Sequence, residues 1–122
     1  MLTNRNILIA DDDNELTSVL SEYLTTEHFY VTTAHDGEEA VSHLRQNRFN
    51  IVVLDLKMPK LGGLEVLKFI KSDCANTKTI VLTAYADLKS VTECKKLGAD
   101  DVIEKPYDIG DLLGAIEFVL KK

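Results

Sequence analysis

The stretch NIVVLDLKMPKLGG, residues 50–63, decides the fold. Its unbroken apolar run from Ile51 to Leu54 is typical of a strand that is buried on both faces of a sheet. The run ends in a single carboxylate, Asp55, and the proline and paired glycines that follow favour a loop. The sequence therefore predicts that Asp55 lies where a buried strand meets a loop, at the edge where parallel sheets bind their ligands.

Short strands and helical segments alternate along the whole chain. Runs rich in β-branched residues predict five strands, at residues 6–10, 30–34, 50–54, 79–83 and 101–104. Apolar residues recur at helical spacing between and after them. In the first helix the predicted buried stripe consists of Leu16, Val19, Leu20, Tyr23 and Leu24. Five repeats of this alternation predict an α/β fold, a doubly wound five-stranded parallel sheet with five helices covering both faces.

Residues that cap the helical backbone mark where the helices begin and end. Asp13 stands directly before the first helix, and capping explains this third acid of the run better than metal contact. Asp36 followed by Glu39 predicts a capping box at the start of the second helix. The fourth helix should begin after Asp87 and end before Gly98, and the fifth should begin after Asp108.

Length and net charge limit the classes of function that are possible. A chain of 122 residues suits one domain, which we expect to span residues 1–122. The net charge of -6 argues against direct binding of nucleic acid or of an anionic membrane, because both require basic surfaces. No apolar run approaches the roughly 20 residues that span a bilayer, and the first residues lack the apolar core of a signal peptide. We therefore expect a cytoplasmic protein.

Polar side chains follow the predicted strands and should meet at one edge of the sheet, because the carboxyl ends of parallel strands all point there. They are Asp11 and Asp12 after the first strand, Asp55 after the third, Thr83 at the end of the fourth and Lys105 after the fifth. Clustered carboxylates repel one another, so without a cation at least one would have a raised pKa. Oxygen ligands with room for water suit Mg²⁺ better than zinc or calcium, and Mn²⁺ can substitute.

Four short motifs occur in order at these strand ends. They are ILIADD at 7–12, VVLDLKMP at 52–59, VLTAY at 81–85 and EKPY at 104–107. Each motif is weak alone, but four independent matches in order rarely coincide by chance. Together they resemble the response-regulator receiver domain of two-component signalling, of the chemotaxis-regulator type. The resemblance covers essentially the whole chain and implies a flavodoxin-like sheet with the strand order 2-1-3-4-5.

The resemblance implies a phosphoacceptor function. Asp55 matches the aspartate that takes a phosphoryl group from the phosphohistidine of a sensor histidine kinase. Thr83 and Lys105 match the hydroxyl and the ammonium that hold the phosphoryl oxygens, and the peptide bond between Lys105 and Pro106 falls where the family usually has a cis bond. Phosphorylation would switch the conformation and regulate a downstream output domain or protein. The chain would then be no enzyme beyond accepting and losing its own phosphoryl group.

The resemblance also implies the metal ligands. Asp12 would bind Mg²⁺ directly and Asp11 through water, and the carboxylate of Asp55 and the backbone carbonyl of Lys57 would complete the protein ligands. Lys57 and Tyr85 also occupy the two positions that flank the approach of water to the phosphoryl group. Because both side chains are long, we expect them to cover that group and to prolong the phosphorylated state to minutes or more.

Two positions depart from the family pattern. Val102 stands three residues before the lysine, where an aromatic residue often couples to the switch threonine. The predicted fifth helix lacks the arginine through which many receivers dimerise. We therefore expect a monomer, or a phosphorylation-dependent dimer formed through other contacts.

Two other functions remain open from the sequence. The run ILIADDD also resembles the nucleophile motif of haloacid-dehalogenase-like phosphatases, with Asp11 attacking and Asp13 as the acid, although Asn14 and Glu15 fit that family poorly. The site of labelling separates the two readings, since a receiver is phosphorylated on Asp55. The third possibility is a receiver-like binding module that is never phosphorylated.

Overall fold

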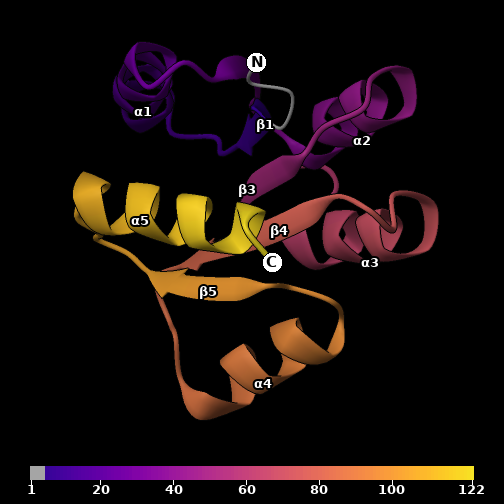
Figure 1. Cartoon of the computed structure of the whole chain (residues 1–122). Coiled ribbons are helices and arrows are strands. Elements are labelled where there is room, and N and C mark those ends of the chain that lie inside the picture. Colours follow the sequence, from indigo (N-terminus) through magenta and orange to yellow (C-terminus); the bar gives the residue numbers. More distant parts are fainter. Residues whose placement is uncertain (1–4) are drawn as a thin grey trace.

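The computed structural model describes residues 5–122 as a single five-stranded sheet with helices on both faces (Figure 1). All strand pairs are parallel and the order is β2-β1-β3-β4-β5, which confirms the predicted fold and strand order. The strands are β1 (Asn6–Ala10), β2 (Tyr30–Ala34), β3 (Ile51–Asp55), β4 (Lys78–Thr83) and β5 (Asp101–Glu104). The expectation about a signal peptide falls partly on residues 1–4, which lie outside the described residues.

Five helices form the two outer layers. They are α1 (Asn14–Thr26), α2 (Gly37–Gln46), α3 (Gly63–Asp73), α4 (Leu88–Lys96) and α5 (Ile109–Leu120). Helices α1 and α5 cover one face of the sheet, and α2, α3 and α4 cover the other (Figure 1). No helix within residues 5–122 is both long enough and apolar enough to cross a membrane.

The central strand β3 joins the two hydrophobic cores. Successive side chains of a strand point to opposite faces, so Ile51 and Val53 pack under α1 and α5. Val52 and Leu54 pack on the other face, under α2, α3 and α4. All four side chains are fully buried, and full burial of a side chain of this size stabilises the fold by roughly 1.5–3 kcal/mol. The continuous apolar run therefore follows from helices covering both faces of the strand.

The helix ends follow the predicted caps. The carboxylates of four aspartates accept hydrogen bonds from backbone N–H groups of the first turns, namely Asp13, Asp36, Asp87 and Asp108. Gly98 has a φ of 104° and follows Leu97, the C-cap of α4, and the N–H of Ala99 donates to the carbonyl of Cys94 at 3.0 Å. In the capping box the Glu39 carboxylate accepts from the N–H of His35, one residue earlier than the usual arrangement.

The buried stripe of α1 differs from the predicted one. Thr17, Leu20 and Leu24 are buried, whereas Val19 is 53% exposed and Tyr23 is 40% exposed. The helix is turned so that Thr17 faces the sheet, where its hydroxyl lies 3.5 Å from the carbonyl oxygen of Asp11. A threonine can occupy this core position because its polar atom has an acceptor there.

Candidate functional site

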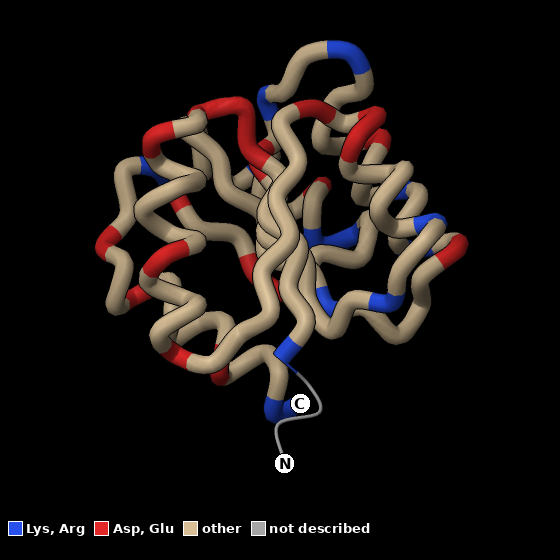
Figure 2. The backbone as a smooth tube through the Cα atoms, turned by 90° about the horizontal axis from the view of Figure 1, so that it is seen from above, with Lys and Arg blue, Asp and Glu red and all other residues tan. Residues whose placement is uncertain are grey.

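The carboxyl ends of β1, β3 and β4 meet at one edge of the sheet, as the fold rule predicts. Figure 2 shows acidic positions on many sides of the molecule, including the end that lies away from the C-terminus. β1 is paired directly with β3, so Ala10 lies beside Leu54 and the aspartates that follow these two residues come close together. Lys105 reaches the same place from the loop after β5.

The ammonium of Lys105 lies between two buried carboxylates. Its Nζ donates to Oδ2 of Asp11 at 2.9 Å and to Oδ2 of Asp55 at 3.1 Å. Asp11 is 2% exposed and Asp55 is 6% exposed, so neither carboxylate can rely on bulk water. Charge-assisted hydrogen bonds of this kind are what make a buried ionic group tolerable. The structure thus brings Asp11, Asp55 and Lys105 together in one compact ionic cluster.

The pKa values reflect this crowding. Burial raises the pKa of the Asp55 carboxyl, and the negative charge of Asp11 raises it further, whereas the backbone N–H of Lys57 and the ammonium of Lys105 act against the rise. Burial lowers the pKa of the Lys105 ammonium, but its hydrogen bonds to the two carboxylates outweigh burial and leave that pKa raised. Lys105 therefore stays charged at neutral pH, whereas the ionised form of Asp55 is less stable than that of an exposed aspartate.

Three carboxylates fit a divalent cation. Asp11, Asp12 and Asp55 each offer one oxygen, and these oxygens all lie within 4.8 Å of one another. Asp12 is exposed, so water molecules can reach a cation held there. A donor set of oxygens with open positions matches the preference of Mg²⁺. At Lys57 the backbone N–H donates to Oδ1 of Asp55 at 3.2 Å; the use of its carbonyl as a ligand stays a prediction.

Thr83 lies at the same edge and is 6% exposed. Its hydroxyl accepts a hydrogen bond from the N–H of Tyr85 at 3.1 Å. Its carbonyl accepts from the N–H of Lys105 at 2.8 Å, which ties the end of β4 to the loop after β5. The peptide bond between Lys105 and Pro106 is cis, as the family resemblance implied.

Gly63 positions the turn that follows Asp55, a role that the sequence pattern did not indicate, because the paired glycines were predicted only to form a loop. It is the first residue of α3, and its N–H donates to the carbonyl of Leu56 at 3.0 Å. A Cβ atom at this position would lie 2.5 Å from the carbonyl oxygen of Asp55 and 2.5 Å from the Cα of Leu56. The helix can begin this close to Asp55 only because residue 63 has no side chain.

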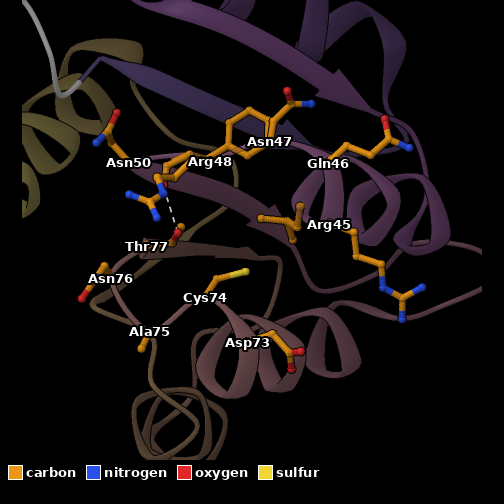
Figure 3. Close-up of a pocket in the computed structure, with 12 residues that line it drawn as sticks. Arg45, Gln46, Asn47, Arg48, Asn50, Asp73, Cys74, Ala75, Asn76 and Thr77 are labelled. Atoms are coloured by element: carbon orange, nitrogen blue, oxygen red, sulfur yellow. Dashed lines mark hydrogen bonds between the residues drawn. The ribbon is translucent and has the colours of Figure 1, made fainter.

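Several surface hollows lie around the fold, and the position of two of them relative to the site is informative. A groove of about 820 Å³ borders Asp12 and runs between α1 and β2, with a lining that includes Thr33 and His35. A cavity of about 470 Å³ lies at the opposite edge, between the loop from α2 to β3 and the loop from α3 to β4 (Figure 3). There the hydroxyl of Thr77 donates to the carbonyl of Phe49 at 2.9 Å. This cavity holds none of the predicted site residues.

Comparisons with known proteins identify the family. The family model described as "Response regulator receiver domain" matches residues 7–117, so the chain belongs to the response-regulator receiver family. Transcriptional regulatory protein CpxR of Escherichia coli is 39% identical over 116 residues, which cover 95% of this chain and 49% of CpxR. The chain therefore spans about half the length of that relative.

Two further relatives match along nearly their whole lengths. Sporulation initiation phosphotransferase F of Bacillus subtilis is 34% identical over 116 residues, covering 95% of this chain and 94% of that protein. The crystal structure of response regulator TrrA from Thermotoga maritima in complex with Mg²⁺ and BeF superposes with a TM-score of 0.84 at 30% identity. That match covers 94% of this chain and 98% of TrrA.

The close approach at Gly63 gives a test with a matched control. We expect Gly63→Ala to lower the free energy of unfolding by about 1–3 kcal/mol, because the methyl group overlaps the backbone of Asp55 and Leu56. The neighbouring Gly62 has nothing within 4 Å of its would-be Cβ, so Gly62→Ala should change stability by less than about 1 kcal/mol. Urea denaturation measures both. Equal effects of the two substitutions would show that the contact at residue 63 does not constrain the turn.

Proposed function

We propose that this chain is a phosphoacceptor, which takes a phosphoryl group onto Asp55 and uses it to change conformation. The observation that supports this most is the ammonium of Lys105 held between the carboxylates of Asp11 and Asp55. A positive side chain beside the acceptor can neutralise charge on an arriving phosphoryl group. The chain acts on its own aspartate and on no separate substrate.

The chemistry is a displacement at phosphorus. A carboxylate oxygen of Asp55 forms the new O–P bond while the P–N bond of a phosphohistidine breaks, and the imidazole leaves with the electron pair and takes up a proton. Phosphoryl transfer has a loose transition state in which positioning and charge neutralisation supply most of the rate. Strand β3 supplies the positioning, because Asp55 extends from a run that is buried on both sides.

We assign Mg²⁺ to the carboxylates of Asp11, Asp12 and Asp55, with Asp12 as a direct ligand and Asp11 acting through water. The backbone carbonyl of Lys57 is the fourth proposed protein ligand. When bound, the ion supplies positive charge against the phosphoryl oxygens, and Mn²⁺ can replace it. Support comes from the spacing of the carboxylate oxygens, within 4.8 Å of one another, and from TrrA, which was crystallised with Mg²⁺ and BeF.

Lys105 and Thr83 then report phosphorylation. Phosphoryl oxygens compete with the two carboxylates for the Lys105 ammonium, and they offer an acceptor to the Thr83 hydroxyl, which now accepts from the N–H of Tyr85. The loop after β4 would follow the threonine. Residue 102 is a valine that packs against the same core as α4. This chain therefore has no aromatic ring at that position to move together with Thr83.

The partners follow from the reaction. The phosphoryl donor is a sensor histidine kinase, and the receiver of the signal is a downstream output domain or protein. We propose one receiver domain over residues 1–122 that acts in the cytoplasm, without direct contact to nucleic acid or membrane, as a monomer or a phosphorylation-dependent dimer.

The phosphatase alternative fits the structure less well. It needs Asp13 as an acid, whereas the Asp13 carboxylate caps α1 by accepting from the N–H of Leu16 at 3.1 Å.

Labelling by a small phosphodonor tests the assignment of Asp55. We expect acetyl phosphate to phosphorylate the protein only with Mg²⁺ or Mn²⁺ present, because the clustered carboxylates otherwise repel the phosphoryl dianion. Asp55→Asn should abolish labelling, and mass spectrometry of the intact protein gives the readout. Label that survives both EDTA and Asp55→Asn would overturn the proposal, and label on Asp11 would support the phosphatase instead.

Lys105→Ala separates metal binding from transfer. The variant should bind Mg²⁺ at least as tightly as the wild type, because it removes an ammonium that now holds two of the proposed ligands. Phosphoryl transfer should nevertheless slow, since loss of one such electrostatic contact commonly costs about 2–4 kcal/mol in the transition state. Calorimetric Mg²⁺ titration and the initial rate of labelling measure the two effects. An unchanged rate would reduce Lys105 to a structural residue.

The lifetime of the phosphorylated state tests the shielding by Lys57 and Tyr85. The Lys57 ammonium lies over the Tyr85 ring, 5.2 Å from its centroid, so these side chains connect the two loops that flank Asp55. We expect wild-type phosphate to last minutes or longer, and the double variant Lys57→Asn/Tyr85→Glu to lose it about tenfold faster, because water then reaches an in-line position. Loss of label is followed at constant Mg²⁺. Equal rates would exclude shielding by these two side chains.

A further inference from the structure

The hydroxyl of Tyr107 is enclosed without a hydrogen-bond partner. The residue follows the cis Lys105–Pro106 bond, and its ring packs against the apolar core under α1 and α5. Within residues 5–122, only two buried side-chain atoms are left without a partner, Oη of Tyr107 and Nε of Arg5. The Arg5 guanidinium still donates through Nη1 to Glu117 at 2.6 Å, whereas the hydroxyl is the only polar atom of the Tyr107 side chain.

An orphaned hydroxyl of this kind destabilises the state that contains it. The group has lost its hydrogen bonds to water and has gained none in the protein. A phenylalanine would fill the same space without that cost. The hydroxyl is therefore expected to find a hydrogen-bond partner in a second state of the protein.

Tyr107 stands two residues after Lys105, whose ammonium donates to the Asp11 carboxylate at 2.9 Å. Burial raises the pKa of Tyr107 to about 12, and the negative charge of Asp11 is the next cause, with Lys105 acting in the opposite direction. The phenol is therefore protonated at neutral pH and available as a donor. The buried carboxylate that Lys105 holds, that of Asp11, is the acceptor that such a donor would suit.

Asp11 depends on Lys105 in the state seen here. Its Oδ1 accepts from the N–H of Asp13 at 3.0 Å and its Oδ2 accepts from the Lys105 ammonium at 2.9 Å. Among the described residues, Lys105 is the only side-chain donor to this carboxylate. When Lys105 turns to a phosphoryl oxygen, Asp11 stays buried and loses this donor, so that the N–H of Asp13 and the proposed Mg²⁺, acting through water, are its remaining partners.

We infer that Tyr107 is a positioning residue for the phosphorylated state, in which its hydroxyl donates to the Asp11 carboxylate as Lys105 leaves. The orphaned hydroxyl disfavours the unphosphorylated state and the new hydrogen bond favours the phosphorylated one, so both act in the same direction. Held in this way, Asp11 also keeps its orientation towards the proposed metal, as an outer donor does for a ligating carboxylate. This inference rests on the proposed phosphorylation of Asp55.

The test is Tyr107→Phe, with Tyr30→Phe as the matched control. Tyr30 is 68% exposed at the start of β2, the outermost strand on the side of the sheet away from β5. Beryllofluoride, as a phosphoryl mimic, is titrated at saturating Mg²⁺ and followed by NMR. We expect the affinity of Tyr107→Phe to fall about tenfold, in the range seen for loss of outer-shell donors, and that of Tyr30→Phe to stay within twofold of wild type.

A second measurement excludes a merely structural effect. Without Mg²⁺ and beryllofluoride, Tyr107→Phe should be at least as stable to urea as the wild type, because the orphaned hydroxyl is gone. Unchanged beryllofluoride affinity, or a loss of stability in the unliganded state, would overturn the inference and leave the role of Asp55 intact. A wild-type protein that ignores beryllofluoride would overturn the proposed function, and the inference with it.

Discussion

Two buried carboxylates that share one ammonium are the constraint on which the rest of this structure depends. Asp11 and Asp55 follow neighbouring strands, so the parallel pairing of β1 with β3 forces their charges together. Lys105 comes from beyond β5, on the far side of β4, and must arrive at the same edge to balance them. A misplaced strand would leave a buried charge without its partner, which proteins tolerate poorly. The charge balance at this edge therefore favours a single strand order.

The hydrophobic layers make that cluster rigid. β3 is buried under helices on both faces, and α3 begins against the backbone of Asp55 because residue 63 is a glycine. Sites supported by packed strands and helices hold their geometry better than sites on loops alone. The Asp55 carboxylate is thus fixed, whereas Lys105 and Thr83 extend from segments that border loops. The arrangement separates a fixed carboxylate, the proposed phosphoacceptor, from groups that can change partners.

Local patterns predict much of this architecture. The apolar run at 51–54, the aspartate caps and Gly98 each carry their own signal, because strand burial and helix capping depend on a few neighbouring residues. The edge that gathers Asp11, Asp55 and Lys105 followed from the general rule for parallel sheets, while the strand order came from the family resemblance. The buried Thr17, the close approach at Gly63 and the enclosed Tyr107 hydroxyl were missed. Each depends on a contact that the folded chain makes outside the regular spacing of a helix or strand, which periodicity does not encode.

The polar groups at the edge suggest how a receiver can switch without an aromatic ring at position 102. A ligand shifts an equilibrium only through interactions that differ between the two states. Here the differing interactions are hydrogen bonds: Lys105 holds two carboxylates, the Thr83 hydroxyl accepts from the loop after β4, and the Tyr107 hydroxyl has no partner. On the proposed function, one phosphoryl group gives each of them a new partner at once. The free energy of switching then comes from exchanging polar partners at the sheet edge, and the packed cores beneath need not rearrange.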